Sequence, residues 1–216
     1  MVKSIVFDLN GVLIDTTELN ASIFEMLFEA FGEGIGAKAA EHYRYNGGIP
    51  RRKRMKMYIE MFTEANADDE TVDMLTEMFS GFFRMNIDSI ELLPGVEDFF
   101  EQNKGKYTFF ISSGATTGDT KAILEKKGLL QYFREIFGSP DSKTEHLKTI
   151  MHKYSLSGDE IVFVGDAPAD AQAATEAGVK FVARRTKEHH WHDYPYVIDS
   201  LQELPEILAK LNAVTD

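Results

Sequence analysis

Short, continuous runs of apolar residues recur along the 216-residue chain, and helical segments separate them. Continuous rather than alternating apolar strands are typical of a parallel sheet whose two faces are both covered by helices. The expected strands are Ser4–Leu9, Tyr107–Ile111, Ile136–Phe137, Ile161–Val164, Lys180–Ala183 and Tyr196–Ile198. The expected helices are Val96–Asn103, Thr117–Lys127, Lys143–Tyr154 and Ala169–Ala177. This alternation predicts an α/β fold with a doubly wound parallel sheet.

Residues 16–91 interrupt the alternation. Apolar side chains recur there at helical spacing, and no convincing strand is present. The stripes are Leu19, Ile23, Met26, Leu27, Ala30 and Phe31, then Met55, Tyr58, Ile59 and Phe62, then Val72, Leu75, Met78, Phe79, Phe82 and Phe83, with Ala37–Tyr45 a weaker helix. We therefore predict a small all-helical domain of residues 16–91, inserted into an α/β core domain formed by residues 1–15 and 92–216.

The composition narrows the classes of partner. A formal net charge of −12 argues against a general surface for nucleic acid or anionic membrane. The absence of cysteine excludes disulfides, thiolate metal sites and a cysteine nucleophile. The N-terminal apolar run is broken at Asp8, unlike a signal peptide, and no apolar stretch approaches the roughly 20 residues of a membrane helix. We expect a soluble cytoplasmic protein, a monomer or weak homo-oligomer, whose partner is a small molecule.

Polar residues that could take part in catalysis or ligand binding follow the ends of the expected strands. Asp8 and Asn10 follow the first strand, and the second ends in hydroxyl residues and a glycine. In chain order the whole set is Asp8, Asn10, Ser112, Ser113, Gly114, Lys143, Asp166 and Asp170. Because the carboxyl ends of parallel strands share one edge of the sheet, we expect these residues to form one site.

The order and spacing of these segments resemble the four motifs of the haloacid dehalogenase-like (HAD) hydrolases. The first motif of that family reads Asp-x-Asp-Gly-x-x-x-Asp. The most specific match here is Gly-Asp-x-x-x-Asp at 165–170, followed by Ala-Ala-x-x-Ala-Gly at 173–178. The helical insert resembles in position the cap domain of the subfamily that includes phosphoglycolate phosphatase and β-phosphoglucomutase. The resemblance implies a HAD-like Rossmannoid core with a helical cap, and a phosphatase acting on a small phosphorylated metabolite such as a sugar phosphate.

The resemblance also implies roles for the residues. Asp8 would attack phosphorus and form an aspartyl-phosphate. The Ser112 hydroxyl, with backbone groups of Ser113 and Gly114, would hold phosphate oxygens, and Lys143 would supply positive charge. Mg²⁺, which suits oxygen ligands, would be held by Asp8, Asp166 and the backbone carbonyl of Asn10.

Other readings of three of these residues stay open. Asp170 would be either a metal ligand or a neighbour that orients the ligands, and a plain helix cap is a third reading. Lys143 could equally be a solvated lysine on the surface. Ser113 could equally be a residue that only shapes the turn. Asp15 is expected to be structural.

Asn10 departs from the motif, because most phosphatases of the family have a second aspartate there. In those enzymes the aspartate protonates the leaving oxygen and then activates water, assistance typically worth about 10²–10⁴-fold. Four explanations of the asparagine stay open. It was introduced into the sequence, or the protein is a phosphatase that is slow or acts on activated phosphates. Alternatively, the protein is a family member with another chemistry, or a non-catalytic relative that binds phosphorylated ligands. A phosphonatase would need a cap lysine, for which Lys53 and Lys56 are candidates, whereas a dehalogenase would leave Asp166 and Asp170 unexplained.

A basic cluster opens one helix of the insert. Pro50 suits the first position of a helix, and Arg51, Arg52, Lys53 and Arg54 follow it after the glycine-rich turn at Gly48. Positive charge there opposes the helix dipole, so the cluster needs a reason. By resemblance to family caps we expect the turn at Gly48 and either Arg51 or Arg52 to contact an anionic substrate. A solvated face paired with glutamates is the alternative.

Overall fold

The computed structural model describes residues 1–46, 49–187 and 189–213. Its centre is a parallel sheet with the strand order β3-β2-β1-β4-β5-β6. The strands are β1 Ser4–Phe7, β2 Thr108–Thr116, β3 Phe133–Ser139, β4 Ile161–Gly165, β5 Lys180–Arg184 and β6 Val197–Ile198. The parallel sheet predicted from the continuous apolar runs is therefore confirmed.

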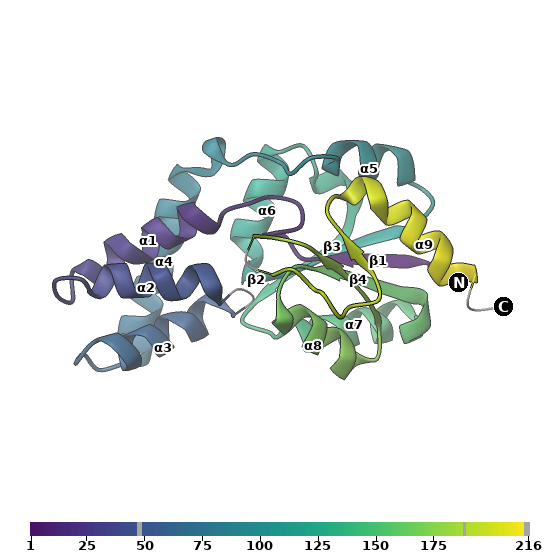
Figure 1. The fold of residues 1–216 in the computed structure, drawn as a ribbon. Helices are drawn as coiled ribbons and strands as arrows, with labels where there is room; N and C mark the ends of the chain where they lie inside the picture. Colours follow the sequence, from purple (N-terminus) through teal and green to yellow (C-terminus); the bar gives the residue numbers. More distant parts are fainter. Residues whose placement is uncertain (47–48, 188, 214–216) are drawn as a thin grey trace.

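Helices cover both faces of this sheet, as a doubly wound fold requires. Figure 1 shows α7 and α8 on one side of the sheet and α5 and α9 on the other. The helices are α1 Thr17–Glu29, α2 Ile35–Tyr45, α3 Arg51–Phe62, α4 Asp69–Met85, α5 Val96–Asn103, α6 Thr117–Lys126, α7 Lys143–Tyr154, α8 Pro168–Ala177 and α9 Leu204–Ala213. Helices α1 to α4 lie together beyond one end of the sheet (Figure 1).

The two faces of β1 carry separate parts of the core. Successive side chains of a strand point to opposite faces. Val6 packs in a cluster with Phe110 and Phe163 on the face covered by α7 and α8. Phe7 belongs to the cluster on the other face, where its ring lies 5.3 Å from that of Phe100 in an edge-to-face arrangement. Burial of β1 on both faces explains why its sequence is apolar without alternation.

The strand order creates a switch point beside β1. The chain passes from β1 to β2 and β3 on one side, whereas β4, β5 and β6 lie on the other. Loops that leave β1 and β4 in opposite directions open a crevice at the carboxyl edge, where open α/β sheets bind ligands. Asp8 directly follows β1 and Asp166 directly follows β4.

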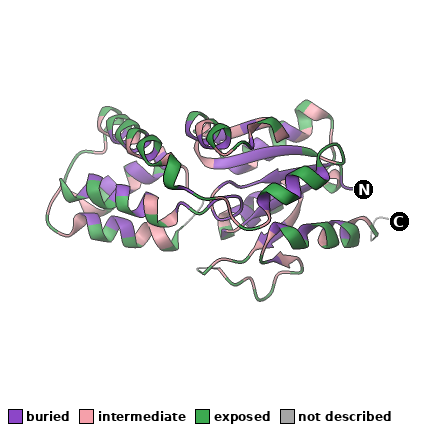
Figure 2. Ribbon diagram, turned by 90° about the horizontal axis from the view of Figure 1, so that it is seen from above, coloured by how far each residue is buried: buried purple, intermediate pink, exposed green. Residues whose placement is uncertain are grey.

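Aromatic side chains hold the four insert helices together. The Phe24 ring of α1 lies 4.8 Å from Phe79 of α4, 5.2 Å from Tyr58 of α3 and 5.1 Å from Tyr43 of α2, so it joins all four helices. Along these helices buried and exposed stretches alternate in Figure 2, as expected for helices that bury one face. The apolar stripes thus form a core of this region, although Met26 and Met78 stay 47% and 43% exposed. The domain boundaries at 15/16 and 91/92 remain a prediction.

Several features differ from the elements expected. Strand β3 spans Phe133–Ser139 and so extends beyond the expected Ile136–Phe137 at both ends. Helix α9 was not predicted, although Leu204, Leu208 and Leu211 are buried at helical spacing. Helix α2 begins earlier than expected, directly after Gly34, whose φ of 76° favours glycine. Strand β2 continues to Thr116, beyond its apolar part. No helix within the described ranges combines the length and the apolar character that crossing a membrane requires.

Candidate active site

Asp8, Lys143 and Asp170 form a buried charge cluster at the carboxyl edge of the sheet. The ammonium of Lys143 lies 2.9 Å from Asp8 Oδ2 and also donates to Asp170 Oδ1. All three side chains are buried. Lys143 is the first residue of α7, which begins with a capping box formed by Ser142 and Glu145, so the helix start fixes where the lysine leaves the backbone. Lys143 is therefore a residue of this site, not a surface lysine.

Two glycines let the loops around these carboxylates approach closely. Gly11 has a φ of 77°, and a Cβ there would lie 2.2 Å from Asp166 Oδ2. A Cβ at Gly165 would lie 2.4 Å from the Cβ of Asp170. Both positions therefore require glycine, which explains why the Asn-Gly and Gly-Asp pairs stand at the ends of β1 and β4.

Burial and crowding change the acidities of the cluster. Burial raises the pKa of Asp8 to about 6; the negative charge of Asp170 adds to the rise, and the Lys143 ammonium opposes it. Burial and the charges of Asp8 and Asp170 raise the pKa of Asp166 well above its ordinary value. Burial alone would lower the pKa of Lys143, but the two carboxylates overcome that effect and raise it. The cluster therefore has an excess of negative charge that a cation would relieve.

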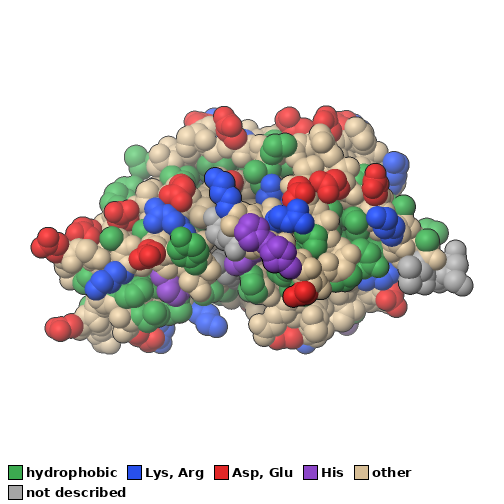
Figure 3. All heavy atoms as spheres, viewed as in Figure 1, with side chains coloured by type: hydrophobic (Ala, Val, Ile, Leu, Met, Phe, Trp, Pro, Cys, Tyr) green, Lys and Arg blue, Asp and Glu red, His purple; other side chains and the backbone are tan. Residues whose placement is uncertain are grey.

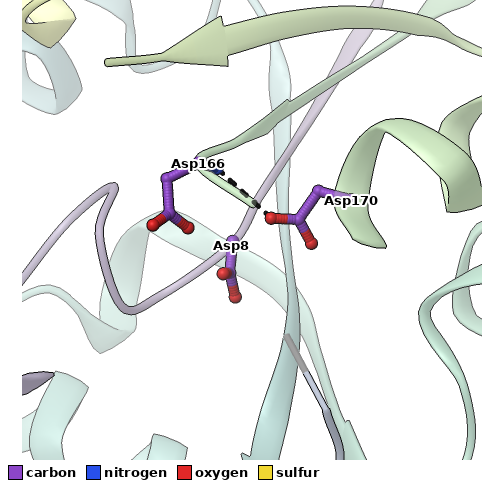
Figure 4. A group of neighbouring side chains, drawn as sticks. All are labelled: Asp8, Asp166 and Asp170. Carbon is purple, nitrogen blue, oxygen red and sulfur yellow. Dashed lines mark hydrogen bonds between the residues drawn. The ribbon is translucent and has the colours of Figure 1, made fainter. Parts of the chain in front are cut away.

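The carboxylates of the three aspartates lie close together (Figure 4), and each offers an oxygen within 4.8 Å of the others. Asp170 is already engaged, because its Oδ2 accepts backbone hydrogen bonds from Asp166 and Ala167 and its Oδ1 accepts Lys143. Its role as a cap of α8 and its place in the cluster are thus compatible. An all-oxygen set with surplus negative charge fits a hard divalent ion such as Mg²⁺, with Asp8 and Asp166 as the better ligands.

The side chain of Asn10 is fixed by a chain of hydrogen bonds. Its Oδ1 accepts the backbone N–H of Thr16 at 2.6 Å and the Thr16 hydroxyl at 2.7 Å. The Asn20 amide donates to the Thr16 hydroxyl and to the Tyr43 hydroxyl, each at 2.8 Å. Two donors on the oxygen orient the Asn10 NH₂ group away from them, so this group is the one left to donate toward a ligand. Asp15 accepts the backbone N–H of Thr17, and its structural role stays a prediction.

The two serines of β2 face opposite sides, and this corrects one prediction. The Ser112 hydroxyl is fully buried and lies 2.9 Å from Nδ1 of His146 on α7. It therefore does not face the cavity next to Asp8, whereas Ser113 and Gly114 line that cavity. Side-chain alternation along a strand allows only one of two adjacent serines to do so. Of the two hydroxyls, that of Ser113 belongs to a residue that lines the cavity, and it accepts the backbone N–H of Ala115 at 3.1 Å.

The basic cluster of α3 divides into different environments. Arg51 lines the cavity but forms a buried ion pair with Asp119 of α6 and donates to the Ser80 hydroxyl at 2.8 Å. Arg52 lies outside the cavity and pairs with Asp69 and Asp73 on the exposed side of α4, so the prediction of a substrate contact is wrong for Arg52. Arg52 instead belongs to a solvated face on which it pairs with acidic side chains, which was the alternative interpretation of the basic cluster. Gly48 lies outside the described residues.

Arg54 was not singled out from the sequence, although it belongs to the same cluster. Its side chain is 2% exposed and lines the cavity. Lys53 and Lys56 are exposed, and neither is among the described residues that line this cavity. A phosphonatase-type lysine therefore has no support in the described part of the chain. Nothing in the sequence separates Arg54 from the other basic residues of the cluster, and only its burial at the cavity in the folded chain identifies it as a residue of this site.

The cavity between sheet and insert has a volume of about 90 Å³. Its floor carries the charged groups of the sheet edge, and its roof carries polar and aromatic groups of α1 to α4. This volume is small beside the roughly 300–1,000 Å³ of sites for drug-sized ligands, so it suits a ligand of few atoms. Thr16, Asn20, Tyr43 and Arg54 belong to this lining and were not predicted.

A switch-point crevice with an aspartate cluster beneath a helical cap is typical of one class of hydrolases, those with a parallel-sheet core domain and a helical insert. Residues 5–184 match the family model described as haloacid dehalogenase-like hydrolase. The chain belongs to this family, as the resemblance in its motifs implied.

A phosphoglycolate phosphatase of Vibrio parahaemolyticus serotype O3:K6 is 25% identical over 224 residues, with 96% of each chain covered. The β-phosphoglucomutase of Clostridium difficile has a similar fold, with a TM-score of 0.83, 21% identity, and coverage of 100% of this chain and 99% of that one. CbbY of Rhodobacter sphaeroides, as an aspartate-to-asparagine mutant in complex with xylulose-(1,5)bisphosphate, has a TM-score of 0.75 and 17% identity, over 94% of this chain and 96% of that one.

The remaining surface does not suggest a second metal centre. Among the described residues, Asp8, Asp166 and Asp170 form the one group of histidines or acids close enough together to hold an ion, so His190 and His192 are not part of one. On the face shown in Figure 3, basic and acidic side chains are interspersed rather than gathered into a basic patch.

Proposed function

We propose that this chain is a Mg²⁺-dependent phosphatase of a small phosphorylated metabolite. The observation that carries the proposal is the buried pair of Asp8 and Lys143 at the floor of a small cavity, next to Asp166 and Ser113. Phosphoglycolate is a candidate substrate, because the similar Vibrio protein is named a phosphoglycolate phosphatase and the cavity suits a ligand of few atoms.

In the proposed reaction an oxygen of Asp8 attacks phosphorus while the bond from phosphorus to the leaving oxygen breaks. The product is an aspartyl-phosphate, which water then hydrolyses. Lys143 keeps Asp8 ionised and in place and compensates negative charge on the phosphoryl oxygens, and the Ser113 hydroxyl donates to one of them. Mg²⁺, when held by Asp8, Asp166 and the backbone carbonyl of Asn10, would supply charge neutralisation between the carboxylates and the phosphate.

Asn10 limits this reaction. Its NH₂ group can donate a hydrogen bond to the leaving oxygen, but it cannot transfer a proton, and it cannot remove one from water. Both steps therefore proceed without general acid–base assistance from this position. This specific observation favours, as a second candidate, a protein that binds phosphorylated ligands and turns them over slowly.

Phosphate release with and without Mg²⁺ tests the proposal. p-Nitrophenyl phosphate and 2-phosphoglycolate are each incubated with the chain and with the Asn10→Asp variant. We expect Asn10→Asp to release phosphate about 10²–10⁴ times faster, only when Mg²⁺ is present. Absence of Mg²⁺-dependent release by both proteins on both substrates would refute the phosphatase and leave the ligand-binding candidate.

A further inference from the structure

Arg184 reaches across the edge of the sheet to the loop that follows β1. It is the last residue of β5, and its Nη1 donates to the backbone carbonyl of Gly11 at 2.8 Å. Because β4 lies between β1 and β5 in the sheet, the side chain bridges the carboxyl end of β4, which Asp166 directly follows. The bond therefore links three strands at the edge that carries the aspartate cluster.

The backbone of Arg184 is itself held in place. The residue pairs with Ile198 of β6 in the sheet, and its carbonyl accepts the indole N–H of Trp191 at 3.1 Å. The Trp191 ring in turn packs against Phe181 of β5, with ring centres 5.7 Å apart. A side chain that starts from a fixed backbone loses less conformational freedom when it binds a loop than one on a mobile segment.

The carbonyl that Arg184 binds belongs to the part of the loop that touches Asp166. A Cβ on Gly11 would lie 2.2 Å from Asp166 Oδ2, and the Gly11 N–H donates to the Ile14 carbonyl at 2.7 Å. Ile14 therefore fixes the peptide between Asn10 and Gly11. Arg184 fixes the next peptide along the chain. The carbonyl of the first of these peptides is that of Asn10, the backbone ligand proposed for Mg²⁺.

Arg184 approaches the aspartate cluster without occupying its oxygens. It lines a surface cavity of about 470 Å³ together with Asp15, Asp166 and Asp199. Within the described ranges it forms no ion pair with them, so the Asp166 carboxylate stays available to an ion. Burial lowers the pKa of the Arg184 guanidinium, and the charges of these three aspartates oppose that change. The arginine thus acts as a hydrogen-bond donor to a neutral carbonyl and does not compete with a metal for its ligands.

We propose that Arg184 is a positioning residue of the metal site, which holds the loop at Gly11 against Asp166. The Asn10 carbonyl and the Asp166 carboxylate would then keep the spacing that Mg²⁺ requires. This inference rests on the proposed function, because that function supplies the metal. Mg²⁺ demands a nearly ideal octahedral arrangement, so a small displacement of one ligand weakens its binding. Groups that orient metal ligands are typically worth about 10–100-fold in metal affinity.

Calorimetric titration with Mg²⁺ tests the inference. We expect Arg184→Gln to raise the dissociation constant of Mg²⁺ about 10–100-fold. The direction of the change is informative, because removal of a positive charge near the aspartates would by itself strengthen the binding of a cation. Arg184→Lys should give an intermediate constant, since an ammonium keeps the charge and can donate but lacks the planar fork.

Arg185→Gln is the matched control. Arg185 is the adjacent residue and carries the same charge, but it is exposed and pairs with Asp199 instead of the loop after β1. We expect this variant to bind Mg²⁺ within about threefold of the unmodified chain. Weaker binding in Arg184→Gln but not in Arg185→Gln assigns the effect to the bond with Gly11.

Ca²⁺ separates positioning from a general loss of structure. It accepts flexible coordination, so we expect Arg184→Gln to weaken Ca²⁺ binding less than Mg²⁺ binding. Equal losses for the two ions, or native Mg²⁺ affinity in a folded Arg184→Gln variant, would overturn the inference. If that variant does not fold, Arg184→Met takes its place, because methionine removes the donors but keeps an unbranched side chain.

The outcomes distinguish this inference from the proposed function. Native Mg²⁺ affinity in Arg184→Gln would refute the positioning role and leave the phosphatase. Mg²⁺ binding that depends on Arg184, without phosphate release by the chain or by Asn10→Asp, would refute the phosphatase and leave the positioning role. An unmodified chain that binds no Mg²⁺ would refute both.

Discussion

The hydrogen bonds of Asn10 make it part of a rigid scaffold. Thr16 donates twice to its oxygen, and Asn20 and Tyr43 continue the chain toward the roof of the cavity. An aspartate at position 10 would accept the same two bonds from Thr16 with one oxygen and have a second oxygen free. The proposed gain of Asn10→Asp therefore comes from proton transfer and not from a rearranged site.

Asp8 as the attacking residue gives a prediction that does not depend on fast turnover. After incubation with acetyl phosphate and Mg²⁺, we expect mass spectrometry to find one added phosphoryl group on the peptide that contains Asp8. The adduct should persist, because Asn10 cannot activate the water that removes it. Asp8→Asn, which lacks the nucleophilic oxygen anion, should remain unmodified. An adduct on another peptide, or the same adduct in Asp8→Asn, would contradict the assigned role.

His146 gives a prediction about pH and stability. Burial lowers its pKa below the ordinary 6.5, and its Nε2 is buried without a hydrogen-bond partner in the described part of the chain. Below pH 6.5 this histidine binds a proton more readily in the unfolded chain than in the folded one, so its contribution to the free energy of unfolding should decrease as the pH falls through this value. The raised pKa values of Asp8 and Asp166 act in the opposite direction, so the contribution of His146 has to be isolated with a variant.

The His146→Asn variant isolates this contribution. Asparagine retains a polar atom for the Ser112 hydroxyl but does not titrate. As the pH falls from 6.5 to about 5, we expect denaturant unfolding to show that the free energy of unfolding of this variant rises relative to that of the unmodified chain. His42, whose pKa burial also lowers, remains in both proteins and cancels in the comparison. Identical pH profiles would show that His146 does not contribute.

At the scale of elements, Asp119 joins the cap helices to the sheet domain. It lies near the start of α6, is fully buried, and accepts Arg51 of α3 together with Ser80 and Arg84 of α4. Arg84 is 52% exposed, so its bond contributes less than that of the buried Arg51. The carboxylate is thus a contact that holds α3 and α4 over the cavity.

Removal of this charge should be costly. We expect Asp119→Asn to lower the free energy of unfolding by about 3 kcal/mol, because it leaves Arg51 buried without a counter-charge. Chemical denaturation measures the change, with Arg52→Gln as an exposed control that should stay within about 0.5 kcal/mol of the native value. In a double-mutant cycle, Asp119→Asn and Arg51→Met should be strongly non-additive. Additive effects would mean that the two side chains do not stabilise each other.

At the scale of the whole molecule, the aspartate cluster couples stability to Mg²⁺. An ion that binds only the folded chain stabilises it by about 2.7 kcal/mol at a concentration 100-fold above its dissociation constant. We expect Mg²⁺ to raise Tm in a concentration-dependent way and a chelator to reverse the change. Asp166→Asn should abolish the effect, whereas Asp159→Asn, an exposed aspartate outside the cluster, should retain it. A native Tm that does not respond to Mg²⁺ would contradict the metal site.

Much of the fold could be predicted because its signals are local. The bounds of α5 and α7 match the predicted helices, since apolar spacing and capping residues lie within each segment. Helix α9 was missed because it follows the last recognised strand without a motif. The meeting of Asp8, Lys143, Asp166 and Asp170 at one edge of the sheet could also be predicted, because parallel strands bring their carboxyl ends together.

The sequence by itself determined the parallel α/β sheet, the helical insert and the aspartates at the strand ends, since periodicity and residue order along the chain encode them. The family followed from the resemblance of its motifs and from the match of residues 5–184 to the family model. Only the tertiary structure decided which polar side chains face the cavity. Ser113 rather than Ser112 does so because the strand alternates, and Arg51, Arg52 and Arg54 differ because of what α4 and α6 place beside them. Such neighbours come from segments far apart in the chain, so burial and charge pairing of a side chain exist only after folding.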